Sequence, residues 1–411
     1  MVISLKEYDK LHIRNTRDSE CGQISKSDAV LLQSLISEDF PLFKLGNRCL
    51  IAQHWVGVID LPGVSIEILP KIAGYHTPQE LRAIIVRMLL VSQMDTAFKS
   101  ISGSVSPTKN SISEVLIDAF LRQLNHYLQY GLISVYEKVE RNQDTVKGRI
   151  LFQKQFQQNI LNPVRFYCRY SKLIQDNGIN QFFKVCLTQM QTASRNRENL
   201  TLIAHSLEFF RDISDISVEQ ALSYPISFNS INAIVSGPYQ YGLLFLKNYN
   251  TSLSAGNILV NAWLYDMNLL FERFIYRTAR QAFGNRVAYQ NSRFFLLFDS
   301  VAQKQYIRLR PDLVLKERDY TIIIDTKWKI PANFSKESDV YQMNAYSTSI
   351  PNVKKVFLLY PLTPNAKRLE RDYSFLPQTD TVRELGIRTV DLGRCLRWRE
   401  FITYFKQIFL E

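Results

Sequence analysis

The sequence lacks the residue patterns that mark several common kinds of site. Its five cysteines are scattered, with no C-x-x-C pair and no histidine at ligand spacing, so neither a zinc site nor a disulfide framework is expected. The five histidines are also dispersed, which gives little support to a histidine-based catalytic centre. No G-x-x-x-x-G-K-S/T phosphate loop occurs, so nucleotide hydrolysis linked to this chain has to come from another chain.

Long apolar runs are absent too. No run approaches the roughly 18 residues that span a bilayer, and the first residues lack a signal-peptide pattern, so we expect a cytoplasmic protein with no membrane partner. The chain has 411 residues and 46% hydrophobic content, which is enough for two or three folded domains. A net charge of +12 favours a polyanionic partner, and nucleic acid fits better than a membrane surface.

One short stretch carries acids at the ends of two expected strands. Residues 313–315 and 321–324 are rich in β-branched and aliphatic side chains and are separated by a charged turn. Asp312 lies on the first strand, Asp325 ends the second, and Lys327 shares a face with Asp325. Two carboxylates suit Mg²⁺, and the lysine would orient or activate a water for phosphodiester hydrolysis. An ordinary surface hairpin would show the same local pattern.

The flanking elements favour a site over an ordinary hairpin. Residues 261–281 predict a long helix with Glu272 beside its apolar stripe. A strand near 293–298, the acid-bearing hairpin, a helix near 335–349 and a strand at 356–360 follow. The expected order is therefore one helix, three strands, one helix and one strand.

This arrangement resembles the core of the PD-(D/E)xK nuclease superfamily. Pro311-Asp312 and Asp325-Thr326-Lys327 match its motif, Glu272 matches the acid of its first helix, and Gln342 with Tyr346 matches the Q-x-x-x-Y element of some branches. The resemblance implies catalysis by Asp312, Asp325, Lys327 and Glu272, with the three acids holding Mg²⁺. Nearby residues expected to contact DNA are Gln342, Tyr346, Arg310 and Lys329.

The N-terminal region reads as β-rich. Strands are expected on both sides of Pro62-Gly63, where proline presets φ and glycine supplies the positive φ of a type II turn. Val64, Ile66 and Ile68 alternate with polar residues, which indicates one buried face. A helix is expected near residues 78–94.

Short phrases across the chain add a second resemblance. Residues 61–71, 148–150 and 176–180, taken with the nuclease motif, resemble the McrC family, the nuclease subunit of McrBC-type modification-dependent restriction systems. The resemblance implies a McrB-like AAA+ GTPase hexamer as partner, GTP bound by that partner, and modified double-stranded DNA as substrate. The resemblance also implies that the N-terminal region binds this partner and stimulates its GTPase. The residues expected to do so are Trp55, Leu61, Pro62, Gly63 and Lys71.

The middle of the chain reads as mainly helical. After a linker-like stretch at 101–110, a helix capped by Ser113 should end at Gly131, and further helices are expected from Asn180 and over 197–213. A basic and aromatic cluster at residues 165–170, with Lys172, is compatible with a DNA contact or with an ordinary solvated face.

These patterns predict an α+β multidomain protein. The expected division is a β-rich partner-binding domain at 1–105, a helical domain at 106–250, and an α/β endonuclease domain with a mixed sheet at 251–411. The leading function is an Mg²⁺-dependent DNA endonuclease subunit. Two alternatives stay open: a regulatory activator of an AAA+ ring with an inactive nuclease fold, and an autonomous DNA-repair nuclease.

Overall fold

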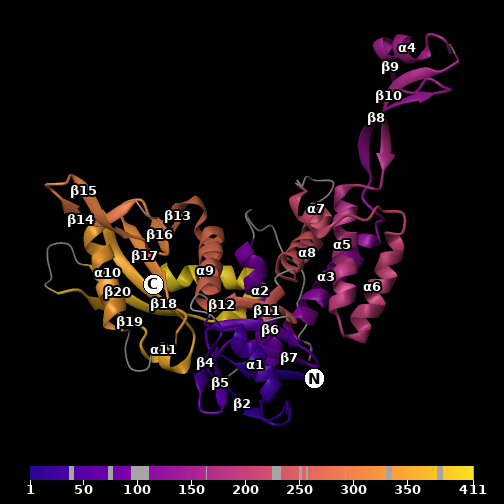
Figure 1. Cartoon of the computed structure of the whole chain (residues 1–411). Helices are drawn as coiled ribbons and strands as arrows, with labels where there is room; N and C mark the ends of the chain where they lie inside the picture. Colours follow the sequence, from indigo (N-terminus) through magenta and orange to yellow (C-terminus); the bar gives the residue numbers. More distant parts are fainter. Residues whose placement is uncertain are drawn as a thin grey trace. The chain divides into compact units, whose positions relative to one another are not determined.

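The computed structural model describes residues 1–36, 41–72, 77–93, 111–162, 164–224, 233–249, 252–255, 258–291, 293–329, 336–376 and 383–410. The chain forms two compact units, which are drawn in Figure 1. One unit comprises residues 1–119 and 248–411, and the other comprises residues 120–247. The expected domain boundaries near 105 and 250, and the linker-like stretch at 101–110, lie outside the described residues. The three-part division therefore stays a prediction.

The N-terminal part of the larger unit contains two sheets. A five-stranded sheet has the order β1 (Val2–Lys6), β7 (Val64–Leu69), β6 (Trp55–Leu61), β12 (Ile258–Asp266) and β11 (Ser252–Ala255). A four-stranded sheet has the order β3 (Gln23–Ser25), β2 (Lys10–Arg14), β5 (Cys49–Ala52) and β4 (Phe43–Gly46), and helix α1 (Lys26–Ser34) follows β3. Side chains from both sheets share one apolar core. The expected turn joins β6 to β7, with Gly63 at φ +81°.

A six-stranded sheet forms the other part of the larger unit. Its order is β13 (Val287–Tyr289), β16 (Leu313–Lys316), β17 (Thr321–Thr326), β18 (Val353–Pro361), β20 (Glu384–Val390) and β19 (Arg371–Ser374). The β17–β18 and β18–β20 pairs are parallel, whereas the other pairs are antiparallel. The mixed sheet that the sequence predicts is therefore confirmed.

Helices cover both faces of this sheet. Met343 of α10 (Glu337–Ser349) packs in one core with Ile323 and Val356, and Phe357, on the opposite face, meets Phe409 of α12 (Trp398–Leu410) with ring centroids 5.2 Å apart. Helix α12 also packs on α9 (Met267–Phe283), which in turn contacts α2 (Pro78–Gln93). Because both faces are covered, β17 is a continuous apolar run up to Asp325. The remaining short elements of this part are η2 (Gly284–Arg286), α11 (Pro364–Arg368) and η3 (Leu392–Leu396).

The helix expected over residues 261–281 is wrong at its start. Residues up to Asp266 belong to β12, which pairs antiparallel with β6. Helix α9 begins only at Met267, because the Asp266 side chain accepts a hydrogen bond from the Asn268 backbone N–H at 2.8 Å and caps the helix. Leu264 fits the apolar spacing of the helix, but its strand pairing with β6 determines the structure here.

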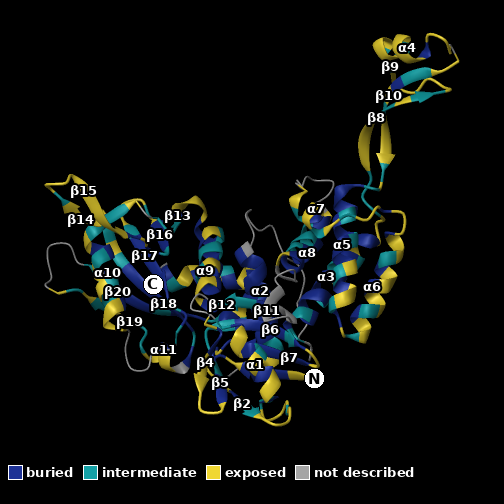
Figure 2. Ribbon diagram, in the orientation of Figure 1, coloured by how far each residue is buried: buried dark blue, intermediate teal, exposed yellow. Residues whose placement is uncertain are grey.

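The smaller unit combines helices with a long two-stranded arm. Helix α3 (Ile112–Leu128) enters it, and the other helical segments are α5 (Gly178–Ala193), α6 (Arg197–Phe209), α7 (Val218–Ser223), η1 (Ala233–Val235) and α8 (Ser236–Tyr249). Strands β8 (Val135–Gln143) and β10 (Phe166–Ile174) pair antiparallel to form the arm, which carries β9 (Arg149–Ile150) and α4 (Phe152–Asn159) at its far end (Figure 1). The sequence predicted α3, α5 and α6 but not α7, α8 or the arm, and Ser113 lies inside α3, so it does not cap that helix. Most of the arm is exposed or half-buried (Figure 2).

None of the described helices is both long enough and apolar enough to cross a bilayer.

Candidate functional site

Strands β16 and β17 bring two carboxylates to one edge of the six-stranded sheet. Asp312 directly precedes β16, Asp325 is next to last in β17, and the antiparallel register pairs Leu313 with Ile324. One oxygen of Asp312 accepts hydrogen bonds from the backbone N–H of Thr326 at 2.7 Å and from its hydroxyl at 2.8 Å. Asp325 is only 1% exposed. The two acids are thus held opposite each other by the hairpin itself.

Lys327 places an ammonium beside these acids. Its Nζ lies 2.5 Å from Oδ2 of Asp325 and donates to Oε1 of Gln342 at 3.1 Å. Gln342 then donates to the hydroxyl of Tyr346 at 2.9 Å, and that hydroxyl donates to the backbone carbonyl of Arg310 at 3.0 Å. Helix α10 therefore orients Lys327 through a chain of hydrogen bonds. The expected DNA contacts of Gln342 and Tyr346 stay predictions.

A third acid approaches from helix α9. Glu272 accepts a hydrogen bond from the side-chain amide of Gln290 at 2.7 Å, and the backbone N–H of Gln290 donates to the carbonyl of Asp312 at 2.9 Å. Gln290 has φ +41°, so this link depends on an unusual backbone conformation. The sequence reading did not assign roles to Gln290 or Thr326. Thr326 lies inside the motif and could have been found, whereas nothing in the sequence marks Gln290.

Carboxylates outnumber the ammonium of Lys327 at this site. Burial, followed by the charges of Asp325 and Glu272, raises the pKa of Asp312 to about 8. Burial also raises the pKa of Asp325, with Lys327 opposing the shift and Asp339 and Glu272 adding to it. Burial alone lowers the pKa of Lys327, but the adjacent carboxylates outweigh it and raise that pKa overall. Lys327 is therefore protonated, and one ammonium faces several acids.

The donor set fits a hard divalent cation. Asp312, Asp325 and Glu272 offer carboxylate oxygens, the ligands that Mg²⁺ prefers, and their mutual repulsion would be relieved by added positive charge. Within the residues that the structure describes, no three His, Cys, Asp or Glu side chains are already grouped closely enough to hold a metal ion. The acids are held instead by Thr326, Lys327 and Gln290, so metal binding requires some of these contacts to exchange.

Arg310 and Lys329, the other two residues expected to contact DNA, differ in exposure and pairing. The side chain of Arg310 is exposed, whereas Lys329 forms an ion pair with Asp339 of α10. Between Lys327 and Lys329, Trp328 donates its indole N–H to the buried carboxylate of Glu7, with distances of 3.0 and 3.1 Å to the two oxygens. The chain just after Lys327 is therefore fixed by a contact with the end of β1.

The segment expected to bind a partner is only partly accessible. Trp55 is half-buried and Leu61 is buried, whereas Pro62, Gly63 and Lys71 are exposed. These five residues lie on the five-stranded sheet or at its end, and none of them belongs to the carboxylate cluster. Their role in partner binding stays a prediction.

The basic and aromatic cluster of the middle region lies on the arm. Arg169 donates to Glu140 at 2.8 Å and Arg165 donates to Asp144 at 3.0 Å. Among the described residues no carboxylate pairs with Lys172. Two of the three cations are thus neutralised locally, which favours the reading of a solvated face.

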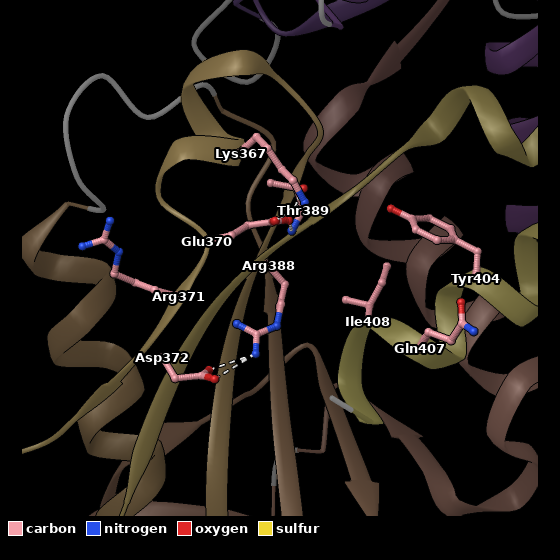
Figure 3. A pocket seen from close by; sticks show the side chains of 9 residues that line it. All are labelled: Lys367, Glu370, Arg371, Asp372, Arg388, Thr389, Tyr404, Gln407 and Ile408. Atoms are coloured by element: carbon pink, nitrogen blue, oxygen red, sulfur yellow. Dashed lines mark hydrogen bonds and ion pairs between the residues drawn. The ribbon is translucent and has the colours of Figure 1, made fainter.

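A depression between β19, β20 and α12 contains none of the candidate catalytic residues (Figure 3). Arg388 pairs there with Asp372 at 3.0 Å, and Lys367 pairs with Glu370. Because most of its charges are satisfied internally, the depression offers no comparable surplus of charge.

Comparisons with known proteins identify a family. Residues 50–361 match the family model described as McrBC 5-methylcytosine restriction system component. The fold is similar to a solved half-complex from a tetradecameric assembly of Thermococcus gammatolerans McrB AAA+ hexamers with bound McrC, with a TM-score of 0.69 at 18% identity over 99% of this chain and 100% of that one. A cryo-EM structure of the Thermococcus gammatolerans McrBC complex matches with a TM-score of 0.51 at 20% identity over 69% of this chain and 88% of that one.

A search of the curated proteins found no match. The matched segment of the family model includes the three acids, Lys327 and the whole β6–β7 hairpin, and it covers well over half of the sequence. The chain therefore belongs to the McrBC 5-methylcytosine restriction system component family, as its resemblance to McrC predicts.

Proposed function

We propose that this chain is the McrC-like endonuclease subunit of a GTP-dependent restriction complex and that it hydrolyses phosphodiester bonds of modified duplex DNA with Mg²⁺. The observation that carries the proposal is the cluster of carboxylates at the edge of the six-stranded sheet, where Asp312 and Asp325 face each other, Lys327 pairs with Asp325, and the charge of Glu272 acts on both aspartates. Membership of a restriction-system family supports the choice of DNA as substrate. The order α9, β13, β16, β17, α10 and β18 supports a PD-(D/E)xK core, although the strand expected near 293–298, β14 (Phe294–Asp299), pairs with β15 (Lys304–Leu309) in a separate hairpin and β13 takes its place in the sheet.

Each side chain has a role in this reaction. Asp312, Asp325 and Glu272 would hold Mg²⁺, which would supply positive charge beside the phosphate and lower the pKa of the attacking water. Lys327 stays protonated, so it donates hydrogen bonds to the phosphate or the water and does not act as a base. Gln342 fixes the direction of the ammonium, and Tyr346 fixes Gln342. Thr326 keeps Asp312 in its rotamer through two hydrogen bonds.

The proposal includes a McrB-like AAA+ GTPase hexamer as partner. The similar solved structure is described as McrB AAA+ hexamers with bound McrC. GTP would bind the partner, because this sequence contains no phosphate loop. Besides the exposed turn at Pro62 and Gly63, and Lys71 beyond the other end of β7, the tip of the arm is a candidate contact surface.

The arm tip carries an apolar stripe. Phe152, Phe156 and Ile160 are 68%, 66% and 73% exposed, and their spacing of four residues places them on one side of α4. Exposed apolar clusters of this kind mark protein interaction sites. We expect Phe152→Ser with Phe156→Ser to reduce stimulation of the partner's GTPase at least ~10-fold, while the melting temperature of the chain is unchanged.

Cleavage by a Lys327→Ala variant tests the catalytic assignment. The assay contains the GTPase partner, GTP, Mg²⁺ and methylated duplex DNA, and it measures cleavage and GTP hydrolysis in the same sample. We expect cleavage to be lost while GTPase stimulation stays at the level of the unmodified protein. Retained cleavage would contradict the proposed site.

The same assay separates the alternatives. GTPase stimulation by the unmodified chain without cleavage at any Mg²⁺ or Mn²⁺ concentration would identify a regulatory activator. Efficient cleavage without the partner or GTP would identify an autonomous nuclease.

A further inference from the structure

A separate two-stranded hairpin stands immediately before the first catalytic acid. Within the described residues, strands β14 (Phe294–Asp299) and β15 (Lys304–Leu309) pair only with each other, and two residues separate the end of β15 from Asp312. Phe294 and Leu309 anchor the base of the hairpin in the core beneath α10. Figure 1 shows the rest of the hairpin projecting beyond the six-stranded sheet.

The projecting part exposes apolar side chains on both of its faces. Leu297 and Phe298 are consecutive in β14 and are 54% and 60% exposed, and Val301 in the turn is 93% exposed. On β15, Ile307 is 58% exposed and has φ +55°, which is rare for a β-branched residue. These apolar side chains are exposed and do not pack in the core of the chain. Exposed apolar side chains on a projecting element are typical of a binding surface.

The hairpin and its ends are also strongly basic. Arg293, Lys304, Arg308 and Arg310 are exposed, and in the described part of the chain no carboxylate forms an ion pair with any of them. The guanidinium of Arg308 lies over the ring of Phe295 at 5.3 Å, and the ammonium of Lys304 lies over Tyr306 at 5.5 Å. Asp299, the hairpin's own acid, accepts backbone hydrogen bonds from Val301 and Ala302 in the turn.

We propose that this hairpin, residues 294–309, binds duplex DNA and places its backbone over the carboxylates. The cations neutralise phosphates, and the apolar tip inserts between base steps from the minor groove, as the apolar wedges of minor-groove binders do. Unpaired positive charge on a projecting element favours a polyanion over a protein surface. The inference rests on the proposed endonuclease function and adds to it the surface that positions the substrate.

Fluorescence anisotropy with a fluorescein-labelled 30-base-pair methylated duplex, without Mg²⁺, tests the proposal on the full chain. Lys304→Gln with Arg308→Gln should weaken binding at least ~10-fold and reduce the slope of log Kd against log salt by about 2, because two phosphate contacts are lost. Leu297→Ser with Phe298→Ser should weaken binding about 5-fold and leave the salt slope unchanged. Lys10→Gln with Lys44→Gln, two exposed lysines of the four-stranded sheet, is the matched control and should change neither quantity.

Each variant should keep its melting temperature and its stimulation of the partner's GTPase. Unchanged DNA affinity in the Lys304 and Arg308 variant would overturn the proposal. Loss of GTPase stimulation with intact DNA affinity would also overturn it, because the hairpin would then be a protein contact. The catalytic assignment fails separately: if Lys327→Ala still cuts while the hairpin variants lose DNA affinity, the hairpin proposal stands and the proposed catalytic site does not.

Discussion

Two sheets of the larger unit contain buried carboxylates with different counter-charges. In the five-stranded sheet the buried acid is paired with a cation, whereas in the six-stranded sheet the acids outnumber the cation beside them. In β7 of the five-stranded sheet, Glu67 is fully buried and accepts hydrogen bonds from Arg82 at 2.8 and 2.6 Å, from Ser4 at 2.7 Å and from the backbone N–H of Ile112 at 3.1 Å. At the edge of the six-stranded sheet, Lys327 is the one cation that pairs with Asp325 among the described residues, and Asp312 accepts only uncharged donors, from Thr326. A guanidinium that matches one carboxylate indicates a structural ion pair. Several acids around one ammonium indicate a place for a further cation.

The largest expected effect is the loss of cleavage in Asp325→Asn, which changes the unmatched cluster, that is, the acids around Lys327. The change keeps the shape of the side chain and removes its charge, so we expect the cleavage rate to fall by about 10³-fold or more. The melting temperature of the metal-free protein should stay the same or rise, because a buried charge is removed. Measured cleavage within 10-fold of the unmodified protein would show that the surplus of acids is not catalytic.

Arg82→Met tests the matched side. It leaves Glu67 buried without its guanidinium, and breaking a buried ion pair costs about 3–5 kcal/mol of unfolding free energy. Urea denaturation measures this loss, and cleavage per folded molecule should be unchanged. Replacing both partners, with Arg82→Met and Glu67→Leu, should recover part of the stability. A double variant as unstable as the single one would contradict the reading of Glu67 as a purely paired acid.

Mg²⁺ should stabilise the folded protein through the cluster of Asp312 and Asp325 and not through the Glu67–Arg82 pair. At a concentration 100 times its Kd, a ligand that binds only the folded state adds about 2.7 kcal/mol to the free energy of unfolding. We expect this gain, followed as a shift in melting temperature, in the unmodified protein and in the Glu67→Leu, Arg82→Met double variant. It should vanish in Asp325→Asn. A shift that survives in Asp325→Asn would place the ion elsewhere.

The sequence predicts the unmatched cluster better than the matched pair, for a physical reason. Asp312, Asp325 and Lys327 lie within one hairpin, so strand alternation and local register already bring them close. Glu67 and Arg82 also lie near each other in the chain, but nothing in their spacing distinguishes a buried pair from two surface charges. The long-range contacts of Gln290 with Glu272 and of Trp328 with Glu7 arise only from tertiary packing.

The same contrast holds for the fold. The strands around 313–315, 321–324 and 356–360 have strong apolar runs, because the sheet is covered on both faces, and each was predicted. The arm strands β8 and β10 expose both faces, so they have no alternation to detect. Strand β12 has a helix-compatible pattern at Leu264, and its pairing with β6 determines its structure.

The last prediction for the unmatched cluster is a pH dependence of the free energy of unfolding. The pKa of Asp312 is raised to about 8 in the folded protein, whereas an unfolded aspartate titrates near ~3.9. Without metal, the folded state therefore binds the extra proton between these values, and the free energy of unfolding falls as pH rises from ~4 to ~8. Asp312→Asn should flatten that decline, as measured by urea denaturation across this range with EDTA present.

Glu7 leaves a background of the same sign. Its burial raises its pKa to about 7, so it also favours the folded state at lower pH and is unaffected by the change at Asp312. If Asp312→Asn leaves the slope between pH 4 and 8 unchanged, Asp312 does not carry the extra proton and the contrast between the two sheets loses its electrostatic basis.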